Sequence, residues 1–233
     1  MPSMPYKARI YIAVVIALGV AQLTGSLIFQ RHFGDPVRYL AYGLLALLAS
    51  TCKVRLPGVT GTMSLNFVFV LIGVAEFSYA ETLIMGCAAG LVQSVWKSPR
   101  RRPVQAAFNV AALALSIAVA YHGSRMVLAA AGTESLPVLL ALGAYLYFVA
   151  NTMLVSTVVA LIEGRALKSV WQQCYLWSFP YYLVGAAVAG LISGLNSSLG
   201  WKLPILVLPA MYLVYTFYRL YLERLEQQRS LPV

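Results

Sequence analysis

Residues 136–162 read LPVLLALGAYLYFVANTMLVSTVVALI, and none of these 27 residues is charged. The hydrocarbon core of a bilayer is about 30 Å thick, and a helix of about 20 apolar residues crosses it. The run is therefore long enough to cross a membrane with some tilt. It predicts a transmembrane helix in this part of the chain.

The composition extends this prediction to the whole chain of 233 residues. Hydrophobic residues make up 61% of it and charged residues only 10%, whereas soluble domains have about 25% charged residues. Apolar runs recur along nearly the whole chain, so the sequence predicts an all-α fold, a polytopic membrane helix bundle. We expect eight spans, at 8–29, 37–52, 63–79, 81–97, 104–122, 136–162, 174–196 and 203–222.

The basic residues predict the orientation of these spans, because cytoplasmic loops of membrane proteins are enriched in Lys and Arg. With a cytoplasmic N-terminus, the outer loops hold only Arg31, Arg38, Arg125 and Lys202. The inner loops hold the other 13 basic residues: Lys7, Arg9, Lys53, Arg55, Lys97, Arg100, Arg101, Arg102, Arg165, Lys168, Arg219, Arg224 and Arg229. This alternation favours eight full spans over a re-entrant pair at 63–97. Both termini are then cytoplasmic.

The segment 163–176, EGRALKSVWQQCYL, has apolar residues at helical spacing with Lys168 and two glutamines opposite. This pattern predicts a helix that lies in the plane of the cytoplasmic interface.

The pair Gly86 and Gly90 has GxxxG spacing, and we expect it to let helices approach closely inside the bundle. Pro180 is expected to kink the seventh span.

The domain organisation predicted from this pattern is a membrane bundle over 1–222 followed by a cytoplasmic exit helix over 223–233. Tyr218, Leu222 and Leu225 step by four and three residues. Such a stripe is the beginning of a seam between two helices, so we expect a homodimer.

Polar and aromatic side chains within apolar spans are candidates for ligand binding, because their burial in lipid is costly. We single out eight: Asn66, Glu76, Gln93, Asn109, Tyr147, Asn151, Thr152 and Tyr181. Two simpler interpretations stay open. The amides can join helices by hydrogen bonds, and Glu76 can lie in water at the headgroup level.

The sequence predicts neither a catalytic nor a metal-binding residue. It contains no HExxH, GxSxG or P-loop motif, and its cysteines and histidines have no metal-ligand spacing. The formal charge of +10 comes from basic residues at the ends of spans. It therefore indicates membrane orientation and contact with lipids rather than nucleic acid binding. No cofactor can be named from the sequence.

Four stretches resemble a known group of membrane domains. They are residues 54–78, the pair Phe108–Asn109, residues 147–164, and residues 208–226, which read LPAMYLVYTFYRLYLERLE. Together with the proline of the seventh span, they are similar to the N-terminal membrane input domains of bacterial HD-GYP and GGDEF cyclic-di-GMP signalling proteins. The likeness covers roughly residues 37 to 226.

This resemblance implies a multi-pass protein of the bacterial inner membrane that passes a signal to a cytoplasmic output domain. The chain has no GGDEF or HD-GYP residues, so no nucleotide chemistry is implied for it. We therefore expect a sensory or signal-input domain that binds a small or lipidic ligand within the bundle and transmits through its C-terminal helix. The alternative is a transport component similar to the substrate-binding subunits of energy-coupling vitamin transporters.

Overall fold

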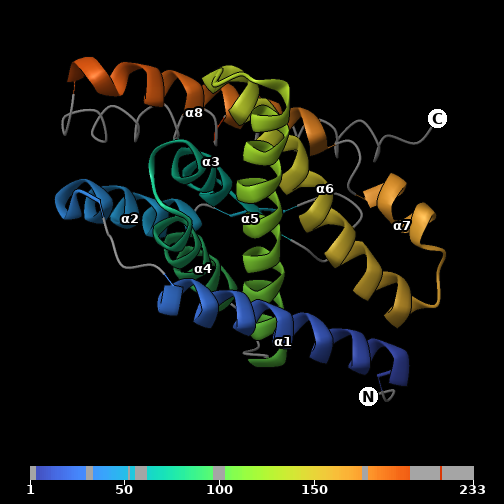
Figure 1. The fold of residues 1–233 in the computed structure, drawn as a ribbon. Helices are drawn as coiled ribbons and strands as arrows, with labels where there is room; N and C mark the ends of the chain where they lie inside the picture. The colour runs from blue at the N-terminus through green and yellow to red at the C-terminus, as the bar shows by residue number, and fades with distance from the viewer. Residues whose placement is uncertain are drawn as a thin grey trace.

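A computed structural model describes residues 4–29, 34–51, 53–55, 62–96, 103–174, 178–199 and 216. In this part the chain is helical except for one short hairpin, as the sequence predicts (Figure 1). Its elements are α1 (Tyr6–Phe29), α2 (Pro36–Thr51), β1 (Lys53–Arg55), β2 (Thr62–Ser64), α3 (Asn66–Glu76), α4 (Tyr79–Val95), α5 (Pro103–Ala131), α6 (Leu136–Glu163), α7 (Leu167–Cys174) and α8 (Phe179–Leu199).

Three of the described helices are long and apolar enough to cross a membrane. They are α1 with 24 residues, α5 with 29 and α6 with 28. Among the shorter helices, α3 has 11 residues, which corresponds to about 16 Å. The helix within the expected span at 63–79 is therefore shorter than the span, because residues 62–64 form a strand and Phe77 and Ser78 form the turn before α4.

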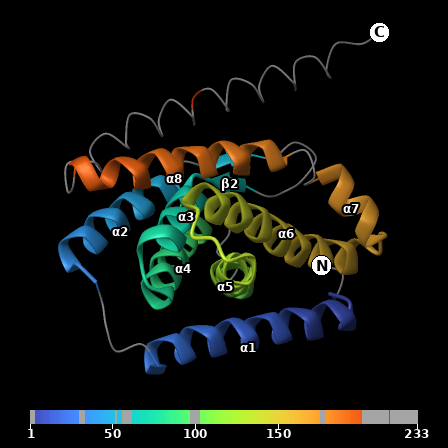
Figure 2. The same ribbon diagram turned by 45° about the horizontal axis from the view of Figure 1, so that its top comes forward.

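The core of the protein lies around α3, which packs against α2, α4, α6 and α8. All nine residues from Asn66 to Val74 are buried. A helix that is apolar on every side is typical of a position in the middle of a bundle. Figure 2 shows α1 and α8 on opposite sides of a layer formed by α3, α4, α5 and α6.

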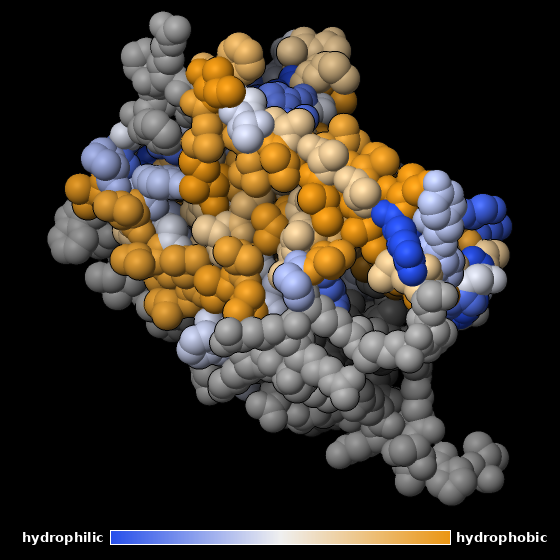
Figure 3. All heavy atoms as spheres, turned by 90° about the horizontal axis from the view of Figure 1, so that it is seen from below, coloured by the Kyte–Doolittle hydropathy of each residue, from blue (hydrophilic) through white to orange (hydrophobic). Residues whose placement is uncertain are grey.

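The outer faces of the bundle are also apolar. On α1 the exposed side chains include Ile10, Val14 and Leu18, and on α8 they include Leu183 and Leu191. Figure 3 shows these residue types as a broad hydrophobic surface over one face of the molecule. Helices that are apolar both towards the core and outwards are compatible with a membrane protein, in which lipid replaces water around the bundle.

A glycine at the end of α5 explains where this helix stops. The expected fifth span, 104–122, was too short, because the helix continues to Ala131. It ends at Gly132, which has φ of 65°. Beyond it the N–H of Thr133 donates to the carbonyl of Leu128, and that of Gly132 to Ala129. These two bonds are the glycine-dependent end of a Schellman motif.

The segment around 163–176 forms helix α7, as predicted, with Val170 fully buried and Lys168 exposed. The expected kink at Pro180 is wrong. Pro180 is the second residue of α8, where a helix has no partner for the missing N–H in any case. It therefore begins a helix instead of bending one.

The hairpin formed by β1 and β2 was not predicted. The two strands are antiparallel, with Lys53 opposite Ser64 and Arg55 opposite Thr62. Both strands have only three residues, which is too few for the alternating pattern that identifies longer strands.

A close crossing of α1 and α5 generates a test of this packing. A Cβ atom built on Gly19 would lie 2.5 Å from the Cβ of Ala111 and 2.6 Å from its Cα. Because Ala111 is buried and its backbone is fixed in α5, we expect Gly19→Ala to lower the free energy of unfolding by about 1–3 kcal/mol. Thermal unfolding in detergent measures it.

The matched control is Gly25→Ala on the same helix, where nothing lies within 4 Å of the added Cβ. Alanine favours helix more than glycine does, so this variant should be neutral or slightly more stable. Equal melting temperatures for the two variants would contradict the crossing at Gly19.

Candidate functional site

An aromatic cluster joins four helices in the half of the bundle that contains α7. We call it the aromatic core, and it consists of Phe67 from α3, Tyr147 and Phe148 from α6, Trp171 from α7, and Phe179, Tyr181 and Tyr182 from α8. The ring centroid of Phe67 lies 4.8 Å from that of Tyr181 and 4.9 Å from that of Tyr182. These distances are those of favourable aromatic pairs.

A glycine on α8 allows this packing. A Cβ atom at Gly185 would overlap the ring of Phe67. The absence of a side chain at Gly185 therefore lets the ring of Phe67 lie directly against the backbone of α8. The ring is thereby held between α8 and its own helix, and α8 cannot shift along α3 without displacing it.

One hydrogen bond fixes the short helix α7 to the aromatic core. Nε1 of Trp171 donates to Oγ1 of Thr152 over 3.0 Å, and Oγ1 of Thr152 donates to the carbonyl of Phe148 over 2.6 Å. The ring centroids of Phe148 and Trp171 are 6.2 Å apart. These contacts with α6 therefore set the position and the orientation of α7.

Three of the predicted ligand residues, Tyr147, Thr152 and Tyr181, lie in or beside the aromatic core. All three side chains are buried. The rings of Tyr147 and Tyr182 pack in a tilted arrangement with centroids 6.0 Å apart, so these side chains contact other rings of the protein. The structure brings the three residues together as parts of a packed contact between helices.

The predicted amides lie on different helices. Nδ2 of Asn66 donates to the carbonyl of Gly86 over 3.4 Å, which joins α3 to α4. Nδ2 of Asn109 donates to Oγ of Ser94 over 3.3 Å, which joins α5 to α4. Both bonds are of the kind that holds membrane helices together.

Asn151 and Gln93 are the other two predicted amides. Both side chains are partly exposed. Asn151 shares the buried face of α6 with Tyr147 and Phe148, because residues three and four apart lie on one side of a helix. Within the described part of the chain its amide makes no hydrogen bond. It is therefore a polar group on a core-facing side that has access to solvent or ligand.

Charged residues gather at the turn between α3 and α4. The carboxylate of Glu76 accepts from the guanidinium of Arg38 in α2, and this guanidinium lies over the ring of Phe77, 5.6 Å from its centroid. The predicted site residue Glu76 is thus neutralised by a partner from another helix.

Glu81 is the second carboxylate at this turn, and it is fully buried. Its Oε2 accepts from the backbone N–H and the hydroxyl of Ser78, and its Oε1 accepts from the N–H of Gly34. Ser78 and Glu81 form a capping box at the start of α4. The sequence carries the signal for it, a Ser followed three residues later by Glu before an apolar run.

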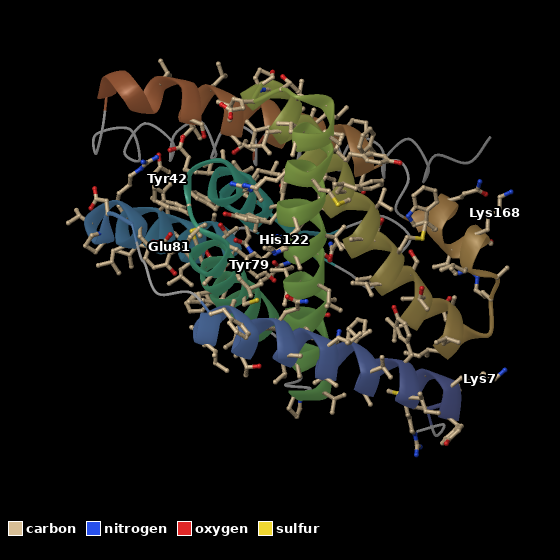
Figure 4. All side chains as sticks on the ribbon, viewed as in Figure 1. Lys7, Tyr42, Tyr79, Glu81, His122 and Lys168 are labelled. Atoms are coloured by element: carbon tan, nitrogen blue, oxygen red, sulfur yellow. The ribbon has the colours of Figure 1, made fainter. Side chains whose placement is uncertain are left out.

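The last turns of α5 complete this end of the bundle (Figure 4). The guanidinium of Arg125 lies 3.7 Å from the ring centroid of Tyr121 and donates to the carbonyl of Val74. The ring of His122 packs in a tilted arrangement against that of Tyr79 with centroids 4.4 Å apart, and the hydroxyl of Tyr79 donates to Gln22 of α1. Four helices thus meet here through polar contacts.

The described residues contain no group of three or more His, Cys, Asp or Glu side chains that could hold a metal ion. The residues predicted for signal exit, Tyr218, Leu222 and Leu225, lie outside the described residues.

No protein-family model matches the chain, and comparison with curated proteins and with solved structures gives no match either.

The contacts of Glu81 predict that its carboxylate stabilises this end of the bundle. Glu81→Ala removes the buried carboxylate that three donors share, the N–H of Gly34, the backbone N–H of Ser78 and the hydroxyl of Ser78. We expect a loss of about 2–4 kcal/mol in the free energy of unfolding. Thermal unfolding in detergent measures it.

The control for this variant is Glu134→Ala, since Glu134 is an exposed residue in the loop between α5 and α6. It should change the melting temperature little. If Glu81→Ala melts within a degree or two of the Glu134 variant, the buried bonds of Glu81 do not hold α2 and α4 together.

Proposed function

We propose that this protein is a membrane-embedded sensory or signal-input domain. In this proposal a small or lipidic ligand binds within the helix bundle, and the signal leaves through the C-terminal helix. The support from the sequence is the resemblance to the input domains of bacterial cyclic-di-GMP signalling proteins. The support from the structure is a single contact, the seating of α8 on α3 and α6.

The aromatic core is what makes this contact suited to signalling. Tyr181 and Tyr182 of α8 pack on Phe67 of α3 and on Phe148 of α6. Helix α8 is also the described helix nearest in sequence to the expected exit helix. A ligand that shifts α3 or α6 must therefore change the seating of α8, because packed cores switch between discrete arrangements.

The ligand site that fits this coupling lies on the core-facing side of α6. Asn151 is partly exposed there, while its neighbour Thr152 is buried and bonded to Trp171. A ligand that forms a hydrogen bond with the amide of Asn151 contacts α6 directly beside Thr152, the residue that links α6 to α7. Asn66 and Asn109 lie on α3 and α5, which pack against α6, and Gln93 lies on α4.

We also propose the bacterial inner membrane as the location, with eight membrane-crossing segments and both termini in the cytoplasm. The short helix α3 is compatible with a full crossing. Its side chains are buried by other helices, and non-helical backbone at membrane depth is tolerated where protein surrounds it. The residues at 62–64 and 77–78 can therefore complete the crossing at its two ends.

This topology predicts that Lys168 and Glu134 lie on opposite sides of the membrane. Both are exposed. In a background with Cys52, Cys87 and Cys174 replaced by alanine, a membrane-impermeant maleimide should label Glu134→Cys in spheroplasts. It should label Lys168→Cys only after permeabilisation. Labelling of both variants from the same side would exclude the eight-segment arrangement.

The signalling role is tested by fusing residues 1–233 to a diguanylate cyclase catalytic domain and measuring cyclic-di-GMP in cells. Gly185→Ala places a Cβ against the ring of Phe67, so we expect the output to change at least about threefold as α8 is displaced. Gly194→Ala on the same helix has nothing within 4 Å of its added Cβ and should leave the output unchanged.

A second variant separates signalling from folding. Phe67→Leu removes the ring atoms that the Cβ at position 185 meets, so Gly185→Ala with Phe67→Leu should return the output towards that of the unaltered fusion. Equal output from all four fusions, at equal protein levels, would contradict a signal-input role for α8. Ligand uptake by proteoliposomes together with that result would support the transport alternative.

A further inference from the structure

The two ends of the bundle differ in charge. Among the residues whose side chains the structure describes, one end carries the basic residues Lys7, Arg9, Arg165 and Lys168 and a single carboxylate, Glu163. The end at the α3–α4 turn carries the guanidinium groups of Arg38 and Arg125 and the carboxylates of Asp35, Glu76 and Glu81. The first group, which we call the basic rim, therefore has an excess of positive charge.

The basic rim comes from two segments that are far apart in the sequence. Lys7 and Arg9 lie in the first turn of α1, and Arg165 and Lys168 lie between the end of α6 and the start of α7. The hydroxyl of Tyr11 donates to the carbonyl of Leu154, which holds α1 against α6 just inside the rim. Figures 1 and 2 both show the start of α1 on the same side as α7.

Three of the four basic residues of the rim have no carboxylate beside them in the described part of the chain. Arg165 pairs with Glu163 over 3.1 Å, but both side chains are more than 40% exposed, so this pair is weak. Within the described ranges, Lys7, Arg9 and Lys168 have no carboxylate at ion-pair distance. Their charges are available to an external anion.

The position of Lys168 is fixed by the fold. Val170 is fully buried, and Trp171 bonds to Thr152, so one face of α7 is held against α6. Lys168 is exposed on the same helix, and Figure 4 shows it pointing outwards on the side of the molecule where Lys7 lies. An amphipathic helix with lysine on its free face is typical of a membrane surface.

Exposed apolar side chains border the rim and identify the kind of partner. Ile10 in α1, Ile162 in α6 and Leu167 in α7 are between 40% and 47% exposed. In Figure 3 hydrophilic residues gather at the right-hand edge, next to the hydrophobic surface. A partner that covers both must present negative charge directly beside hydrocarbon, which a phospholipid does with its phosphate and acyl chains.

We propose that the basic rim binds the phosphate groups of anionic phospholipids in the cytoplasmic leaflet. This inference rests on the proposed membrane location, and it names anionic phospholipids as regulators of the proposed sensory domain. Because Trp171 links α7 to α6 and to the aromatic core, headgroups bound at Lys168 act on the same helices as the proposed signal. Each basic residue near an anionic membrane surface strengthens binding about fivefold.

The test is native mass spectrometry of the full chain, titrated in detergent with phosphatidylglycerol and, separately, with phosphatidylcholine. We expect the unaltered protein to bind phosphatidylglycerol at least tenfold more tightly than phosphatidylcholine. The variant with Lys7→Gln, Arg9→Gln and Lys168→Gln should lose most of this preference. The matched control with Lys7→Arg, Arg9→Lys and Lys168→Arg keeps the charges and should keep the preference.

Three outcomes would overturn the proposal. The glutamine variant could retain the full preference, the two lipids could bind equally to the unaltered protein, or inorganic phosphate alone could displace the lipid. The last result would identify free phosphate as the ligand. These readouts do not use the cyclase fusion, so a failure of the lipid site is distinguishable from a failure of the signalling role.

Discussion

Burial of α3 on every side is the constraint on which the rest of the bundle depends. Nine consecutive residues of this helix, from Asn66 to Val74, are buried. A helix satisfies its own backbone hydrogen bonds, which allows such a segment to lie among apolar neighbours without water. Helices α2, α4, α6 and α8 pack around it, and each of them contributes buried apolar side chains to the same core.

The two ends of α3 have different neighbours, and this difference organises the molecule. At its start, Phe67 enters the aromatic core and makes contact with α8 through Tyr181 and Tyr182. At its end, Glu76 pairs with Arg38, and the turn that follows carries the buried Glu81. The first end couples helices through ring packing, whereas the second ties them through charge and hydrogen bonds.

Three of the eight residues predicted from the sequence as ligand-binding lie close together in the structure, in a packed contact between helices. Tyr147, Thr152 and Tyr181 were recognisable because aromatic and hydroxyl side chains stand out within apolar runs, and they do lie together. Glu81 was missed as a structural residue although its SxxE spacing is visible in the sequence. Its partner Gly34 is 47 residues away, and no local pattern connects a loop glycine to a carboxylate at that separation.

The sequence by itself determined the helical class of the protein, the approximate position of each described helix, and the charges at their ends. Apolar runs, helix-ending glycines and basic clusters are local properties, and local spacing is sufficient to read them. Only the tertiary structure decided which helix is central and which residues meet. The seating of Gly185 on Phe67 and the bond from Trp171 to Thr152 depend on the distances between helices. Those distances follow from packing of the whole core, to which every helix contributes at once.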